Sequence, residues 1–134
     1  MVNLEKMAGM AEDAGIVSVY LTPLEVNAQK ASRMWMAGVG IDYDQVTGEI
    51  EAFSTMIRES GRLYIDTGKD FAAFAEGDAD LSGLPLQEEN ELPASPDAAY
   101  VDGVHPTPEG YRFLAGTVLA WVTAHAAELG LQQQ

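Results

Sequence analysis

Asp102 and His105 stand three residues apart at the start of a strongly predicted helix, and this pair is the clearest chemical signal in the chain. Thr107 can accept a hydrogen bond as the helix N-cap, and Pro108 suits the first helical position, where no backbone N–H is needed. Gly103 frees the backbone between the two side chains, so that the carboxylate can reach one ring nitrogen of the imidazole. An imidazole held in this way is a general base that needs a nucleophile.

The segment 100–111 resembles the last sequence block of the SGNH (GDSL-type) hydrolases. In that family an Asp-x-x-His-Pro turn opens the C-terminal helix and completes a Ser-His-Asp triad, and the matching residues here are Asp102 and His105. Residues 3–7 and 14–23 are similar to the family's third helix and the strand after it. The resemblance implies hydrolysis of short-chain carboxylic esters or thioesters, with His105 as the base, Asp102 holding its tautomer, and no cofactor or metal.

The blocks that hold the rest of that family's machinery are absent. Members carry the nucleophilic serine in an N-terminal Gly-Asp-Ser block, followed by a Gly and a Gly-x-Asn-Asp block that supply oxyanion donors. No serine of this chain lies in a Gly-Asp-Ser or Gly-x-Ser-x-Gly context, and the six are Ser18, Ser32, Ser54, Ser60, Ser82 and Ser95. The sequence therefore predicts the Asp-His-bearing C-terminal half of a carboxylesterase or lipase-like acyl hydrolase. The alternative is a truncated, non-catalytic scaffold that acts by self-association.

Composition limits the remaining classes of protein. With 134 residues and 47% hydrophobic content, the chain is expected to form one domain. The resemblance implies that this domain, residues 1–134, is a partial hydrolase-like one. Its net charge of −14 would repel nucleic acid and anionic membranes, so neither is an expected partner. The chain has no cysteine, which excludes disulfides and thiolate metal sites. No signal peptide or membrane-spanning run is recognisable, so a cytoplasmic location is the default expectation.

Hydrophobic periodicity predicts an α/β fold with about two parallel strands and three to four helices. The resemblance to the SGNH hydrolases implies that these elements are the C-terminal half of a three-layer, doubly wound parallel sheet. The alternation of helix and strand implies a right-handed crossover between parallel strands. The predicted helices are 4–14, 45–60 and a long one from Pro108 to near Gly130, and the predicted strands are 16–21 and 63–66.

Two strands are too few for such a sheet, which has about five. Parallel strands that are apolar on both faces would leave unpaired backbone groups at their edges and a wide exposed apolar surface. The sequence therefore predicts self-association, as a homodimer that pairs strand edges or exchanges elements, or binding of a complementing N-terminal half.

The segment 76–99 is rich in Gly, Pro and acidic residues and is predicted to be a loop. Part of it matches the spacing of an EF-hand calcium loop, with oxygen ligands at Asp78, Asp80, Ser82 and Glu89. Pro85 at the eighth loop position argues against the match, because the backbone N–H there normally pairs with a second loop. A calcium-binding module is therefore a third hypothesis.

Several large side chains are more readily explained by structure than by function. Trp35 and its neighbouring methionines, Met34 and Met36, could line an acyl pocket, although core packing is favoured. Tyr111 and Trp121 are predicted to be core residues of the last helix. His125 lies on the predicted core-facing stripe of the same helix and is expected to be structural.

Overall fold

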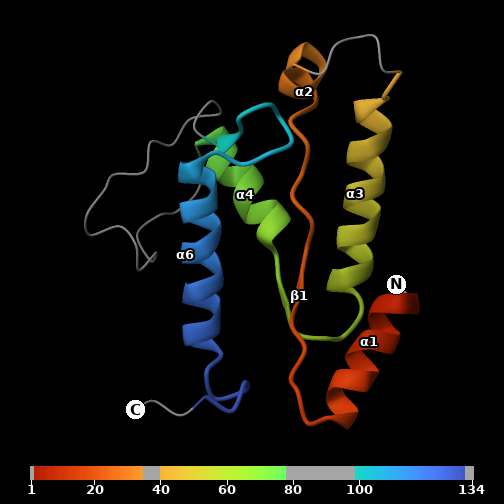
Figure 1. Ribbon diagram of the computed structural model, residues 1–134, viewed down its shortest axis with the longest axis vertical. Coiled ribbons are helices and arrows are strands. Elements are labelled where there is room, and N and C mark those ends of the chain that lie inside the picture. Colours follow the sequence, from red (N-terminus) through yellow and green to blue (C-terminus); the bar gives the residue numbers. More distant parts are fainter. Residues whose placement is uncertain (1, 35–39, 78–98, 132–134) are drawn as a thin grey trace.

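In the computed structural model of this chain, the described residues are 2–34, 40–77 and 99–131, without the side chains of residues 32–34. These residues form a mixed α/β structure of five helices and a two-stranded parallel sheet. The elements are α1 (Val2–Asp13), β1 (Tyr20–Leu21), α2 (Ala28–Met34), α3 (Tyr43–Arg58), β2 (Tyr64–Ile65), α4 (Thr67–Glu76) and α6 (Pro108–Ala124). Figure 1 shows the strands running between α3 on one side and α4 with α6 on the other.

The two strands pair in parallel, with Tyr20 opposite Tyr64 and Leu21 opposite Ile65. The predicted strand positions and their parallel direction are confirmed, but the regular pairing is shorter than the predicted 16–21 and 63–66. The apolar run of the first predicted strand is exposed where it begins, since Ile16 and Val17 are 60% and 50% exposed. Among the described residues only β2 pairs with β1. The other edge of β1 therefore has no strand partner within these residues.

Local sequence signals set the helix ends. Asp42 caps α3 by accepting hydrogen bonds from the backbone N–H groups of Asp44 and Gln45, both at 3.1 Å. At the end of α1, Gly15 adopts a φ of 72°, and the Ile16 N–H donates to the Ala11 carbonyl at 2.8 Å. This left-handed closure stops the helix and turns the chain into the segment that leads to β1.

The largest buried cluster joins α4, α6 and the residues before the last helix. Phe74 stacks on Phe113 with ring centroids 4.5 Å apart, and Phe71 meets Tyr100 edge to face at 5.0 Å. A second cluster of Ala8, Tyr20 and Ile57 packs α1 and α3 against β1. Because Tyr100 belongs to the first cluster, the core itself fixes the segment that leads into the Asp102–His105 turn.

The packed face of α6 differs from the predicted one. Tyr111 is 59% exposed, so its predicted core position is wrong. The buried residues of α6 are Gly110, Phe113 and Gly116, and Phe113 stacks on Phe74 of α4. A Cβ at position 110 would lie 3.0 Å from the Phe71 ring, which shows how closely the helix approaches its neighbour. Gly110 allows this approach because it has no Cβ, and the contact face of α6 therefore lies away from Tyr111.

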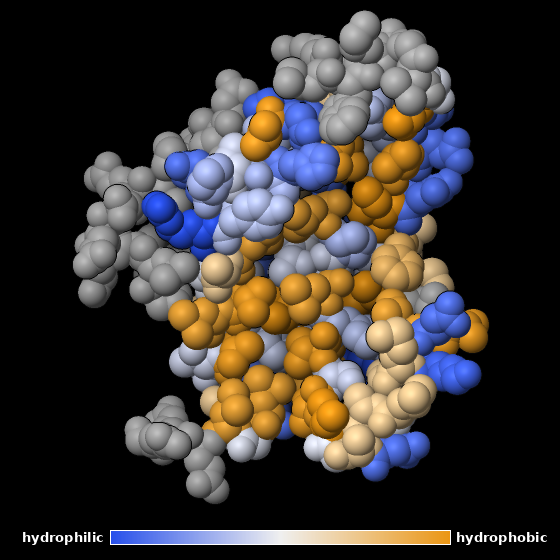
Figure 2. All heavy atoms as spheres, viewed as in Figure 1, coloured by the Kyte–Doolittle hydropathy of each residue, from blue (hydrophilic) through white to orange (hydrophobic). Residues whose placement is uncertain are grey.

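The face of the molecule turned towards the viewer in Figure 2 carries a broad apolar band over β1 and the neighbouring parts of α6 and α3. In the segment that leads into and forms β1, Ile16, Val17 and Leu21 are at least half exposed. In the part of the chain that the structure describes, no helix is both long and apolar enough to cross a bilayer.

Candidate active site

The segment 100–106 forms a closed turn that leads directly into α6. Tyr100 and Pro106 form an antiparallel bridge, and the Val101 N–H donates to the His105 carbonyl at 2.8 Å. The Thr107 hydroxyl then accepts from the Gly110 N–H at 3.0 Å, which confirms Thr107 as the N-cap. In Figure 1 this turn lies beside α2, at the end of the molecule towards which both strands run. The carboxyl edge of an open α/β sheet is where ligands ordinarily bind.

The structure brings the two predicted site residues, Asp102 and His105, into direct contact. The Asp102 Oδ2 atom lies 2.8 Å from the His105 Nδ1 atom. The other carboxylate oxygen, Oδ1, accepts hydrogen bonds from the backbone N–H groups of Val104 at 3.0 Å and His105 at 2.8 Å. Both oxygens are therefore engaged, and the carboxylate cannot rotate without breaking a hydrogen bond.

Solvent exposure differs sharply between the two side chains. The Asp102 side chain is 15% exposed, whereas the His105 ring is 61% exposed. Burial raises the pKa of Asp102, but the hydrogen bonds from the His105 backbone and ring and from the Val104 backbone outweigh it and lower the pKa to about 2. A carboxylate that stays ionised at neutral pH favours the histidine tautomer with its proton on Nδ1. That tautomer leaves Nε2 as the basic nitrogen, on an imidazole that solvent and substrate can reach.

Gly103 connects the turn to α2 and leaves no room for a side chain. Its φ is 89°, in the region that disfavours other residues, and its carbonyl accepts from the Asn27 N–H at 2.8 Å. A Cβ there would lie 2.7 Å from the Asn27 carbonyl oxygen and closer still to the Ala31 nitrogen. The sequence predicted the conformational freedom of Gly103, but not this contact.

Three supporting residues were missed from the sequence. Asn27 accepts from the Lys30 N–H at 2.9 Å and so caps α2, and Lys30 Nζ donates to the Tyr100 carbonyl at 2.6 Å. The Tyr100 hydroxyl donates to the Glu25 carbonyl, and burial raises the pKa of this tyrosine. Asn27 before a helical segment is a recognisable cap signal. The other two contacts join residues at least 70 positions apart and have no local signature.

A second polar group ties the carboxyl ends of the two strands together. Arg58 donates to both oxygens of Asp66, at 2.8 and 3.0 Å, and the Thr22 hydroxyl donates to the same carboxylate at 3.0 Å. Burial raises the pKa of Asp66, but the Arg58 and Thr22 hydrogen bonds outweigh it and hold the pKa below its usual range. The Gly68 N–H donates to the Thr22 hydroxyl at 2.8 Å. All of these groups have partners within the group, so we interpret it as a structural brace.

The nucleophile that His105 would serve is not found among the described side chains. Ser54 is buried within α3, and the Ser60 hydroxyl donates to the Ile57 carbonyl at 2.7 Å. Ser18 lies before β1, at the amino end of the strand, whereas the Asp102–His105 turn lies at the carboxyl edge. None of these three serines is hydrogen-bonded to His105. The other three serines have side chains outside the described set.

Two site predictions fall on residues that the structure does not describe, and the predicted loop at 76–99 lies almost entirely there as well. The candidate calcium ligands Asp78, Asp80, Ser82 and Glu89 lie there, as do Trp35, Met36 and the side chain of Met34. Both hypotheses therefore stay predictions. Within the described ranges, no three His, Asp or Glu side chains gather as a metal site would require.

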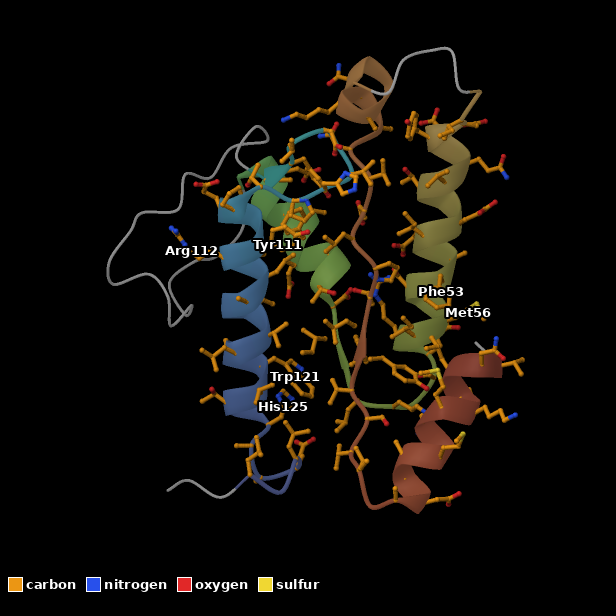
Figure 3. The ribbon with its side chains drawn as sticks, in the orientation of Figure 1. Phe53, Met56, Tyr111, Arg112, Trp121 and His125 are labelled. Carbon is orange, nitrogen blue, oxygen red and sulfur yellow. The ribbon has the colours of Figure 1, made fainter. Side chains whose placement is uncertain are left out.

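A cavity of about 820 Å³ separates β2 from the second half of α6. Its apolar lining includes Ile65, Phe113 and Trp121, and neither residue of the Asp102–His105 pair is part of it. Figure 3 shows Trp121 and His125 pointing from α6 towards the strands. Their rings stack 4.0 Å apart, and His125 Nδ1 lies 2.9 Å from the Trp121 carbonyl. Trp121 is therefore only half-buried beside a cavity, and not enclosed in the core as predicted.

No protein family model, curated protein or solved structure matches this chain.

Proposed function

We propose that this chain carries the Asp-His part of an SGNH (GDSL-type) serine ester hydrolase, on the C-terminal half of a three-layer, doubly wound sheet. The observation that supports this most strongly is the oriented pair of Asp102 and His105, with Oδ2 and Nδ1 2.8 Å apart. The mixed α/β fold and the parallel strands agree with it. The turn also lies at the sheet edge where such chemistry is expected.

The proposed reaction is a two-step acyl transfer. His105 Nε2 takes the proton from a serine hydroxyl as that oxygen attacks the ester carbonyl, and returns the proton to the departing alcohol. Water then attacks the acyl-enzyme with the same imidazole as the base. Asp102 stabilises the imidazolium in both steps, and its own low pKa keeps it from taking the proton. The substrates are small carboxylic esters or thioesters.

A serine-directed fluorophosphonate probe tests the proposal. The probe phosphonylates a serine only when a neighbouring base activates it, so the chain or its complex with a serine-bearing partner should be labelled, and His105→Ala should abolish the labelling. His125→Ala is the matched control, because it removes a second histidine that is bonded within α6. Labelling that is equally lost in both variants, or equally kept, would disprove the role of His105.

The second candidate is a non-catalytic scaffold that retains the Asp102–His105 turn and acts through binding. The observation that favours it is that none of the described serines contacts His105. Complete absence of fluorophosphonate labelling, with the protein folded, would support this candidate over the hydrolase.

A further inference from the structure

The outer edge of β1 has its backbone groups unpaired within the described structure. The N–H groups of Tyr20 and Thr22 donate to the carbonyls of Leu63 and Ile65, at 2.9 and 3.1 Å. Because alternate residues of a parallel strand direct their hydrogen bonds to opposite edges, the N–H and C=O of Leu21 point away from β2. Leu21 is also 50% exposed.

This edge lacks the features that normally prevent strand addition. Exposed edge strands usually carry a charged residue, a proline or a bulge. The segment from Ile16 to Leu21 contains no charge and no proline, and four of its six residues are Ile, Val or Leu. Three of these, Ile16, Val17 and Leu21, are at least half exposed. The open edge of β1 is therefore suited to pair with an added strand.

Charge argues against a second copy of this chain as the occupant. An antiparallel pair of identical segments around Val19 would bring Asp13 of each copy towards Glu25 of the other, whereas the neighbouring Glu12 is already paired with Arg62 of its own chain. Burial raises the pKa of Glu25 most, and nearby carboxylates, Glu51 first among them, raise it further against the opposing charge of Arg58. Two chains of net charge −14 also repel each other over their whole surfaces.

We propose that the open edge of β1 binds an extended strand from a different polypeptide, a strand that is uncharged along its length and flanked by basic residues. Backbone hydrogen bonds to Leu21 and burial of Ile16 and Val17 supply the attraction, and basic flanks complement the acidic residues at both ends of the segment. If the strand adds in parallel, its carboxyl end lies at the same sheet edge as the Asp102–His105 turn. In that orientation, and on the proposed function, the partner can present a serine to His105.

Designed peptides test the edge directly. The probe is a fluorescent peptide of alternating valine and threonine with two lysines at each end, compared with the same peptide carrying glutamates at its ends. Fluorescence anisotropy should show saturable binding of the lysine-flanked peptide, at least about tenfold tighter than the glutamate-flanked one at low salt, with the difference shrinking as salt screens the flanks.

Edge variants locate the binding. Leu21→Lys and, separately, Val17→Lys place a charge on the edge and should each weaken binding of the lysine-flanked peptide at least about tenfold. Val2→Lys is the matched control: it makes the same kind of change at an 84% exposed residue of α1 and should leave binding unchanged. Circular dichroism confirms that each variant is folded.

Two results would overturn the proposal. One is no saturable binding of the lysine-flanked peptide to the folded wild-type chain. The other is sedimentation showing a wild-type homodimer that Leu21→Lys and Val17→Lys dissociate, since a second copy would then occupy the edge. Strand binding with no fluorophosphonate labelling would leave this inference standing and reject the hydrolase, so the two proposals fail separately.

Discussion

Replacing Gly103 by alanine tests whether the Asp102–His105 turn is anchored to α2. Two costs add at this position. A side chain at a φ of 89° costs roughly 1–2 kcal/mol. The new Cβ would also press on the Asn27 carbonyl and the Ala31 backbone, which forces the turn and α2 apart and disrupts the Asn27 to Gly103 hydrogen bond. Such a displacement adds about 1–3 kcal/mol.

Gly61→Ala is the matched control for this substitution. Gly61 has a similar φ of 74°, but a Cβ built there has no neighbour within 4 Å. Urea denaturation of the two variants therefore separates backbone strain from contact with α2. The free energy of unfolding should fall by about 1–2 kcal/mol for Gly61→Ala and by about 2–5 kcal/mol for Gly103→Ala. Equal losses would refute the contact between the turn and α2.

The same variants have a second readout at the site. If Gly103 holds the turn in place, Gly103→Ala should disturb the hydrogen bond between Asp102 and the His105 ring, whereas Gly61→Ala should not. NMR detection of the His105 Nδ1 proton follows this bond. An unchanged Nδ1 proton signal in Gly103→Ala would show that the pair is positioned without α2.

Three further substitutions test the electrostatics and the core. The low pKa of Asp102, about 2 against 3.8 for an ordinary aspartate, stabilises the fold above pH 3.8, and this contribution is lost as the pH falls through 2. Asp102→Asn should therefore flatten that part of the pH dependence of the unfolding free energy in urea melts. An unchanged profile would contradict the low pKa of Asp102. Arg58→Met should raise the pKa of Asp66, measured by carboxyl NMR titration, and cost about 1–2 kcal/mol, because the pair is only partly exposed; an unmoved pKa would exclude the brace. Phe71→Ala should cost about 3–5 kcal/mol in thermal unfolding, since this ring is fully buried; a loss under about 1 kcal/mol would mean that the cluster is poorly packed.

Features set by neighbouring residues could be predicted from the sequence. The Thr107 cap, the start of α6 at Pro108 and the contact between Asp102 and His105 all involve residues within a few positions of one another. The two parallel strands followed from short apolar runs. Each of these features depends on backbone geometry or on one nearby side chain, so local patterns are sufficient.

Features set by distant residues could not be predicted in this way. The short helix α2 was missed because seven residues of mixed polarity give no clear period. The packed face of α6 differs from the predicted one because Gly110 contacts Phe71 of α4. Periodicity within a helix does not identify such a partner. The Gly103 contact with Asn27 likewise joins segments far apart in the chain. These contacts support the site, so its stability could not be foreseen from the Asp102–His105 motif alone.

Hydrolysis of a p-nitrophenyl ester by the wild-type chain and by His105→Ala, in the presence of any strand partner that binds β1, tests the central claim most directly. The value of kcat/KM should fall by at least about a thousandfold in His105→Ala, as expected when a triad member is lost. His125→Ala, which changes a histidine outside the turn, should retain the wild-type rate. Equal hydrolysis by the wild type and His105→Ala would contradict a catalytic role for His105.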